Sequence, residues 1–125
     1  MHTVGKIDKE IYRCITDDIV TEEVIIIDNQ IKHIRERHPN DYERFAEYFS
    51  EIIADPDYIL EANRPNTAFI LKQIQHDEIK FQLILRLQTS LDSAEYKNSI
   101  ITFFKIETKK WEKYLRNKKI LYRKE

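Results

Sequence analysis

Apolar residues recur at two different periods in different parts of the chain. Between residues 40 and 54 they return every three or four positions, which is the spacing of one face of an α-helix. Asn40 and Glu43 stand at the spacing of a capping box, and Pro56 follows the apolar stripe. We therefore predict a helix over 40–54 that packs one face on a sheet. The stripe consists of Tyr42, Phe45, Ala46, Phe49, Ile52 and Ile53.

The second half of the chain follows the two-residue period of β-strands. From residue 79 to 88, apolar side chains occupy alternate positions, so one face of this strand is apolar and the other is half-polar. Residues 67–74 and 99–106 are also strand-like, and residues 75–78 form a connection of hairpin length. Shorter strand-like runs are found at 7–14, 23–28, 58–62 and 120–122.

The stretch from Asp28 to Pro39 predicts a short helix that carries much of the titratable chemistry of the chain. Asp28 is a good N-cap residue, and Pro39 cannot extend a helix. His33 and Arg37 are four residues apart and therefore share one face. The other face carries Ile31, Ile34 and His38.

Helices precede an antiparallel meander in the chain, an order that predicts an α+β fold rather than repeated βαβ units. A final helix begins near Thr108, which can cap it, and ends near Arg116. We expect N-terminal helices packed on a roughly four-stranded antiparallel sheet, with this C-terminal helix. The length suffices for one domain, 1–125, with residues 1–20 as an N-terminal strand extension and 105–125 as a basic C-terminal segment.

The composition excludes several classes of function. The chain has a single glycine, Gly5, so it lacks the glycine-rich loops that bind nucleotide phosphates, and we expect no cofactor. No window approaches 18 consecutive apolar residues, and the N-terminus lacks the apolar core of a signal peptide. One cysteine, Cys14, suits a reducing compartment. We therefore expect a cytoplasmic protein without a membrane partner.

The net charge of −1 conceals an uneven distribution. Residues 105–125 contain nine Lys or Arg and three Asp or Glu, a local charge of +6, so the first 104 residues carry −7. With Trp111 and Tyr114, this basic segment fits a surface that binds a polyanion such as RNA. On charge alone, the solvated face of an amphipathic helix is the better interpretation.

The histidines favour acid–base chemistry over metal binding. His33 and His38 are five residues apart, which separates them by roughly 140° around a helix, so we expect no metal site. Cleavage of RNA by its own 2′-hydroxyl group requires a base, an acid and a cation on the phosphate. His33 and Arg37 supply a titratable group and a bidentate phosphate ligand one helical turn apart. Lys72 and Arg86 add positive charge if both lie on the exposed face of the sheet.

Three segments resemble a known family of nucleases. They are the motif Ile-x-His-Ile-x-x-Arg-His-Pro at 31–39, the Asp-Pro-Asp segment at 55–57 and the hydrophobic run with a threonine at 100–104. In this order they resemble the phage-associated nucleases of the BECR superfamily, named for barnase, EndoU, colicin and RelE. The likeness spans roughly residues 22–110. It implies helices packed on a four-stranded antiparallel sheet and a metal-independent endoribonuclease, often a toxin that cleaves tRNA or other cellular RNA. The partners that we expect are RNA and an immunity or antitoxin protein.

The resemblance assigns roles to particular residues. His33 becomes a general base or acid, Arg37 a phosphate clamp, and Thr102 a hydrogen-bonding group for the substrate. His38 is either the second proton-transfer group or a structural support for the first. The acidic first 104 residues depart from the basic field usual in a ribonuclease, so binding would rely on the basic C-terminal segment. On their chemistry rather than on the resemblance, the residues expected to contact RNA are Lys72, Arg86, Lys105 and Trp111.

Two other functions fit the same sequence. The first is a non-catalytic domain of this fold that binds RNA or a protein partner through Trp111, Tyr114 and the basic segment. The second is an accessory protein of a mobile element whose partner is a protein, such as an immunity factor or a phage component. Cleavage of RNA separates the enzyme from both alternatives.

Overall fold

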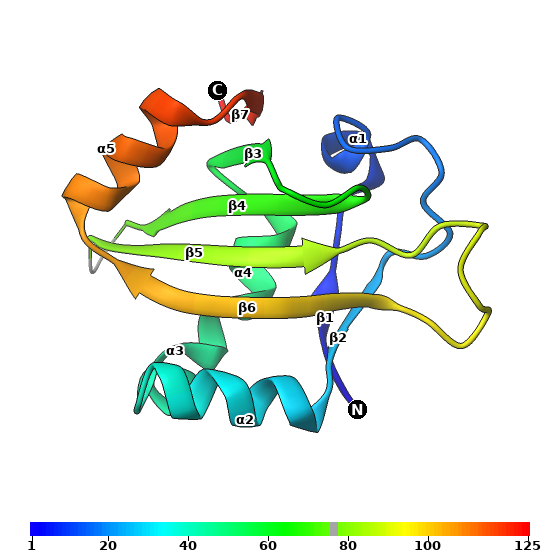
Figure 1. The fold of residues 1–125 in the computed structure, drawn as a ribbon, viewed down its shortest axis with the longest axis horizontal. Helices are drawn as coiled ribbons and strands as arrows, with labels where there is room; N and C mark the ends of the chain where they lie inside the picture. Colours follow the sequence, from blue (N-terminus) through cyan, green and yellow to red (C-terminus); the bar gives the residue numbers. More distant parts are fainter. Residues whose placement is uncertain (76–77) are drawn as a thin grey trace.

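A mixed seven-stranded sheet forms the centre of the computed structural model, which describes residues 1–75 and 78–125 (Figure 1). The strand order is β1-β2-β6-β5-β4-β3-β7; β2 and β6 are parallel, and all other neighbours are antiparallel. The strands are β1 (His2–Lys6), β2 (Glu23–Ile26), β3 (Tyr58–Glu61), β4 (Thr67–Ile74), β5 (Ile79–Arg86), β6 (Asn98–Ile106) and β7 (Ile120–Arg123). The helices are α1 (Lys9–Tyr12), α2 (Asp28–Arg37), α3 (Asp41–Phe45), the 3-10 helix η1 (Ala46–Tyr48), α4 (Phe49–Ala54) and α5 (Thr108–Asn117).

All but one of the predicted strands and the C-terminal helix are confirmed, but the sheet is larger than expected. Strands β3 to β6 form the predicted antiparallel unit, and β1, β2 and β7 extend it at both edges. The prediction of a strand over 7–14 is wrong, because Asp8 caps the helix α1 by accepting a hydrogen bond from the backbone of Glu10 at 2.9 Å. The predicted hairpin connection, 75–78, includes residues 76 and 77, which lie outside the described residues.

The predicted helix over 40–54 is broken into α3, η1 and α4. Asn40 has a left-handed backbone with φ of 73° and makes no capping bond, so the predicted capping box is wrong. Glu43 instead accepts a hydrogen bond from Arg35 of α2 at 2.5 Å. Asp28 likewise begins α2 without capping it, because its carboxylate bonds to His2 at 2.6 Å. Most of the predicted apolar face is nevertheless buried: four of its six side chains lie in the main core, and Tyr42 and Ala46 are partly buried against it.

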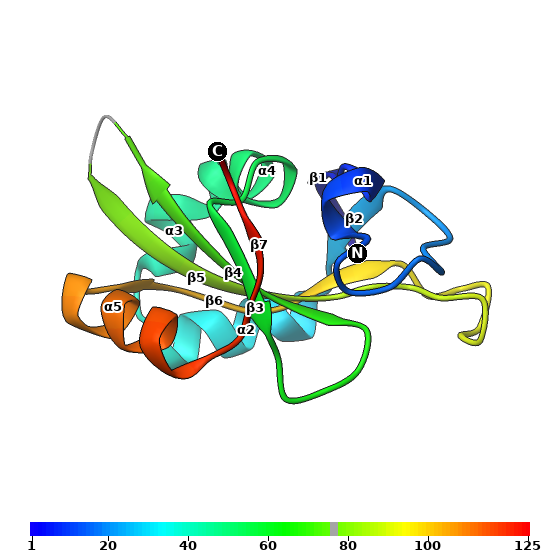
Figure 2. The same ribbon diagram turned by 90° about the horizontal axis from the view of Figure 1, so that it is seen from above.

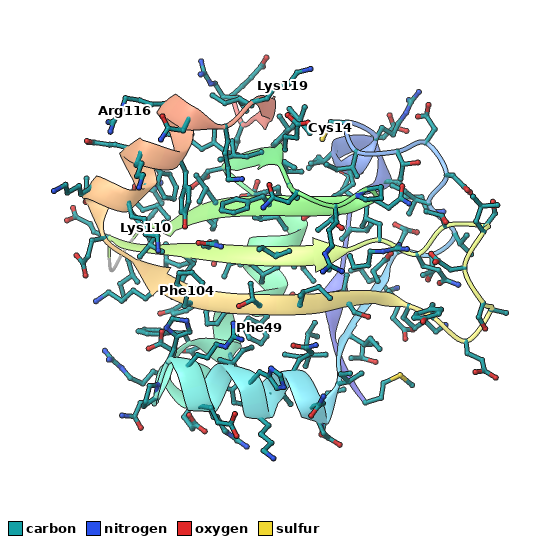
Figure 3. All side chains as sticks on the ribbon, in the orientation of Figure 1. Cys14, Phe49, Phe104, Lys110, Arg116 and Lys119 are labelled. Atoms are coloured by element: carbon teal, nitrogen blue, oxygen red, sulfur yellow. The ribbon has the colours of Figure 1, made fainter. Side chains whose placement is uncertain are left out.

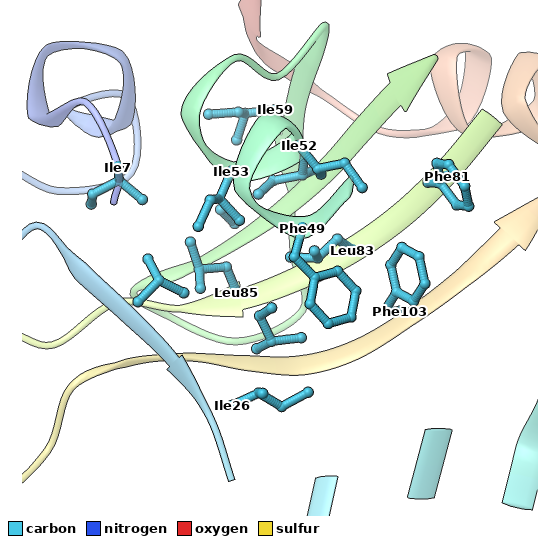
Figure 4. Close-up of a cluster of buried hydrophobic side chains, with 14 of the residues drawn as sticks. Ile7, Ile26, Phe49, Ile52, Ile53, Ile59, Phe81, Leu83, Leu85 and Phe103 are labelled. Carbon is cyan, nitrogen blue, oxygen red and sulfur yellow. The ribbon is translucent and has the colours of Figure 1, made fainter. Parts of the chain in front are cut away.

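Helices cover both faces of the sheet and divide the core in two. Figure 2 shows α4 on one side of the sheet and α5 on the other. The main core lies under α4, where Phe49 packs edge-to-face on Phe103 of β6 and Phe103 stacks on Phe81 of β5 (Figure 4). The smaller core lies under α5, where Trp111 packs against Tyr58 with 9% of its surface exposed. Because helices cover β4 on both faces, its residues are buried without alternation.

The Asp-Pro-Asp segment at 55–57 fastens α4 to the sheet. The ammonium group of Lys72, on β4, lies 3.2 Å from a carboxylate oxygen of Asp55 and 3.5 Å from one of Asp57. Asp57 also accepts a hydrogen bond from the backbone of Gln73 at 2.8 Å. Asp55 also accepts a hydrogen bond from Lys124. This bond, and to a smaller extent the one from Lys72, holds the pKa of the Asp55 carboxyl below its usual range. The stabilisation is therefore present at neutral pH and is lost as the pH falls through this lowered pKa.

None of the helices in the described part of the chain is long and apolar enough to cross a bilayer.

Replacing Lys72 tests whether this buried cation holds α4 to the sheet. Its side chain is 4% exposed, so Lys72→Ala removes a buried cation from Asp55 and from the largely buried Asp57 and should lower the free energy of unfolding by about 3 kcal/mol. Lys124→Ala is the control, because Lys124 bonds to the same Asp55 but is 42% exposed. It should cost at most about 1 kcal/mol. Urea denaturation at pH 7 measures both, and equal losses would contradict the account.

Candidate functional site

The position of α2 follows from a short parallel pairing inside the sheet, one strand in from the β1 edge. Strand β2 pairs with β6 at two positions only, Val24 with Asn98 and Ile25 with Ser99. The chain then turns into α2, which runs alongside the rest of β6 (Figure 1). Ile31 and Ile34 of α2 are buried in the main core, so the intervening side chains of this helix remain exposed.

A register shift in β6 brings three further side chains toward α2. Ile84 pairs with Thr102 and Leu85 pairs with Ile100, so Ile101 is the extra residue of a bulge, and it is 40% exposed. Thr102 and Phe104 follow on alternate positions and lie on the face of the sheet opposite α4, because Phe103 between them points into the main core.

These two elements enclose one pocket, which we call the α2–β6 pocket. It has a volume of about 410 Å³. All four predicted catalytic residues line it: His33, Arg37 and His38 come from α2 and its end, and Thr102 comes from β6. The remaining lining residues are Gln30, Ile34, Ile101 and Phe104.

His33 and Arg37 are exposed and available to a ligand. Within residues 1–75 and 78–125, neither side chain makes a hydrogen bond or an ion pair with the protein. Arg35 differs, because its guanidinium is occupied by Glu43 on the far side of the helix. The pocket therefore holds an uncompensated cation beside a titratable ring, which favours a negatively charged ligand.

The ring of His38 is fixed at the wall of the pocket. It stacks on Phe104 with the ring centroids 4.3 Å apart and the planes 19° from parallel. The backbone N–H of His38 donates to the carbonyl of Ile34 at 2.8 Å and ends the helix. His38 thus packs on Phe104 and also lines the pocket, and its role as a second proton-transfer group stays a prediction. The stack fixes the plane of the His38 ring and covers one of its faces. Phe104 does not cover the two ring nitrogens, because they lie at the edge of the ring.

Four lysines continue the surface beyond His38 toward α5. A second hollow of about 630 Å³ is lined by His38 and Phe104 together with residues at the end of β6 and the start of α5. We call its basic residues the lysine ridge; they are Lys105, Lys109, Lys110 and Lys113. The ammonium group of Lys110 lies 5.3 Å from the centre of the Phe104 ring, and Figure 3 labels both side chains. The basic C-terminal segment therefore adjoins the α2–β6 pocket.

The structure separates three predicted contact residues from this pocket. Lys72 points to the opposite face, among the acidic groups below α4, so the condition that it shares an exposed face with Arg86 is not met. Trp111 is a core residue rather than an exposed stacking platform. Arg86 does lie on the face of the sheet opposite α4, but its guanidinium donates hydrogen bonds to the carboxylate of Asp92 at 3.0 and 3.2 Å. Hydrogen bonds from the backbone of Thr89 and, to a smaller extent, from Arg86 lower the pKa of the Asp92 carboxyl. The ion pair between Arg86 and Asp92 therefore stays charged at neutral pH.

Sequence reasoning missed several residues of the site. Gln30 precedes His33 by three residues and Arg37 by seven, so helical spacing alone could have placed it on the same face. Phe104 could not be found in this way, because its contact with His38 depends on how α2 lies beside β6. In the described part of the chain, no group of three His, Cys, Asp or Glu residues is arranged to hold a metal ion.

A comparison with known proteins assigns the chain to a protein family. The model of one protein family, described as phage-Barnase-EndoU-ColicinE5/D-RelE like nuclease 2, matches residues 1–123. The curated proteins and the solved structures contain no match to the chain. Because the family model covers nearly the whole sequence, the chain belongs to this family of phage-associated nucleases of the BECR type.

Proposed function

We propose that the protein is an endoribonuclease that cleaves RNA through attack of a 2′-hydroxyl group on the adjacent phosphate. The observation that carries the proposal is the composition of the α2–β6 pocket, where two histidines, an unpaired arginine and a threonine share one surface. Transesterification requires two proton-transfer groups and a cation, and it requires no nucleophile from the protein. Membership in a nuclease family supports the choice of a phosphodiester substrate.

His33 and His38 divide the two proton transfers. One histidine accepts the proton of the 2′-hydroxyl group as its oxygen forms a bond to phosphorus. The other donates a proton to the 5′-oxygen as the bond between phosphorus and that oxygen breaks. The products are a 2′,3′-cyclic phosphate and a free 5′-hydroxyl group, and neither step uses a metal ion.

Arg37 and Thr102 bind the phosphate between the histidines. The guanidinium of Arg37 donates two parallel hydrogen bonds to phosphate oxygens and stabilises the negative charge that develops on them. Thr102 donates its hydroxyl hydrogen to the substrate from the opposite wall of the pocket. Because α2 and β6 supply these groups from two sides, the phosphate is held between rigid elements rather than on a loop.

The lysine ridge supplies attraction for the rest of the RNA backbone. The protein has a net charge of −1, so its overall field does not attract a polyanion. Local positive charge next to the pocket compensates for this, since four lysines line the adjoining hollow. Each lysine that neutralises a phosphate also makes binding depend on salt.

The proposal extends to a toxin-like role in phage or mobile-element conflict, with tRNA as one candidate target. A cytoplasmic enzyme of this kind would damage the RNA of its own host cell. An immunity or antitoxin protein is therefore the expected partner.

Substitutions in the pocket test the catalytic assignment. His33→Ala and Arg37→Ala should each lower the initial rate of cleavage of total RNA in EDTA by at least about 100-fold, because each removes a group that acts on the reacting phosphate. Lys32→Ala and Arg35→Ala are matched controls on the same helix, since neither residue lines the pocket. Intact RNA with the wild-type protein, or equal activity in all four variants, would refute the proposal. Salt-dependent binding without cleavage would favour the non-catalytic alternative.

The chemistry of the substrate offers an independent test. Replacement of a single ribonucleotide by its 2′-deoxy form at a mapped cleavage position should abolish cleavage there, because the attacking oxygen is absent. The neighbouring positions should still be cut, with cyclic phosphate termini detectable by mass spectrometry. Cleavage that persists at the deoxy position requires a water or protein nucleophile and contradicts the mechanism.

The salt dependence of binding tests the lysine ridge. A triple variant, Lys109→Gln, Lys110→Gln and Lys113→Gln, removes three cations beside the pocket. Affinity for single-stranded RNA should fall, and the slope of log K against log salt should become shallower by about 2, since each phosphate contact contributes about 0.7. The control triple, Lys6→Gln, Lys9→Gln and Lys32→Gln, makes the same change in charge on elements away from the ridge. An unchanged slope in the first triple would remove the ridge from the binding surface.

A further inference from the structure

A large apolar hollow adjoins the α2–β6 pocket on its other side. It has a volume of about 800 Å³, and it shares Ile101 with the pocket. Phe69, Ile84 and Ile101, from three adjacent strands, form its floor. Its outer wall is the connection between β3 and β4, which includes Asn63 and Arg64. We call this space the Phe69 hollow.

Three cations line the Phe69 hollow, and two of them, Arg86 and Lys118, already have partners in the protein. Arg86 is paired with Asp92, and its guanidinium also donates to the carbonyl of Leu87. The ammonium group of Lys118 lies 4.7 Å from the centre of the Phe69 ring and 3.5 Å from the carbonyl oxygen of Glu61. A phosphate would gain little from these two occupied cations, and below Arg64 at the outer wall it would lie on an apolar floor, where a buried charge is costly.

An uncharged planar group with polar edges fits such a surface well. The apolar side chains can contact its faces, while the amide of Asn63 and the guanidinium of Arg64 can bond to its edge. A nucleobase has this combination of properties, and an RNA chain whose phosphate lies in the α2–β6 pocket carries a base next to that phosphate. In a duplex the faces and the pairing edge of the base are covered, so only an unpaired base can enter.

We propose that the Phe69 hollow binds the unpaired nucleobase next to the scissile phosphate, so that the substrate of this nuclease is single-stranded RNA. The inference rests on the proposed function, because the phosphate in the α2–β6 pocket positions the base. The RNA strand then runs across the face of the sheet opposite α4, between α2 and α5. The lysine ridge contacts the backbone on one side of the cleaved bond, and the Phe69 hollow contacts the base on the other.

Binding of an uncleavable RNA tests this assignment separately from catalysis. The probe is a fluorescent 2′-fluoro pentanucleotide, with an abasic residue placed at each position in turn. At one position, loss of the base should weaken binding to the wild-type protein about tenfold, because stacking of that base is lost. Annealing the probe to its complement should also weaken binding about tenfold, since paired bases cannot enter the hollow.

Two variants ask whether the Phe69 hollow is responsible for that difference. Ala62→Trp fills the space from the outer wall without altering the sheet strands β4 to β6, and Ile84→Asp places a carboxylate on its floor. Each folded variant, checked by circular dichroism, should bind the complete and the abasic probe with equal affinity. Lys119→Asp is the control, because Lys119 lies outside the hollow, and it should keep the tenfold difference.

The outcomes separate the two proposals. A tenfold difference that survives in both hollow variants, or a duplex that binds as tightly as the single strand, overturns the base-binding site and leaves the nuclease proposal intact. Base-dependent binding by a protein that cleaves no unmodified RNA supports the hollow and overturns the proposed function.

Discussion

The buried side chain of Asn98 joins the segments on which the geometry of the site depends. Its amide oxygen accepts a hydrogen bond from the backbone of Gln88 at 2.8 Å, just after β5. Its amide nitrogen donates to the carbonyls of Thr21 and Glu23 at 2.7 and 3.0 Å, at the entry to β2. Asn98 is fully buried, so each of these groups would cost about 1–3 kcal/mol if left unpaired. Because β2 leads into α2, the same bonds place α2 beside β6 and His33 across the pocket from Thr102.

The two faces of the sheet have different chemistry. On the α4 face, the buried cation Lys72 is matched by carboxylates and the apolar residues are closely packed. On the other face, between α2 and α5, Arg37 and the lysine ridge form no ion pair among the described residues, although Glu107 lines the same hollow as the lysines. Unpaired cations cost little folding free energy where water solvates them. A phosphate that binds there removes the repulsion between neighbouring cations. The division explains how a protein of nearly neutral net charge can present a surface for a polyanion.

Local patterns predicted the local features of this fold, and long-range contacts produced the rest. Alternation identified β5 because only one of its faces is apolar, whereas β4 is buried on both faces, so its sequence could not reveal on which side Lys72 lies. The spacing of His33 and Arg37 predicted their common face because both belong to one helix. The parallel pairing of β2 with β6 joins residues more than 70 positions apart, and no local sequence pattern predicts it. Thr102 was found through family resemblance alone.

The central claim is that RNA binds on the face between α2 and α5, with its phosphate in the α2–β6 pocket. Chemical-shift mapping of the ¹⁵N-labelled protein with an uncleavable single-stranded RNA tests it most directly. The account predicts that the backbone amides of 30–38 and 99–106 shift with a common dissociation constant, while those of 51–57 and 72–73 on the α4 face do not. Shifts confined to the α4 face, with α2 and β6 unaffected, would contradict it.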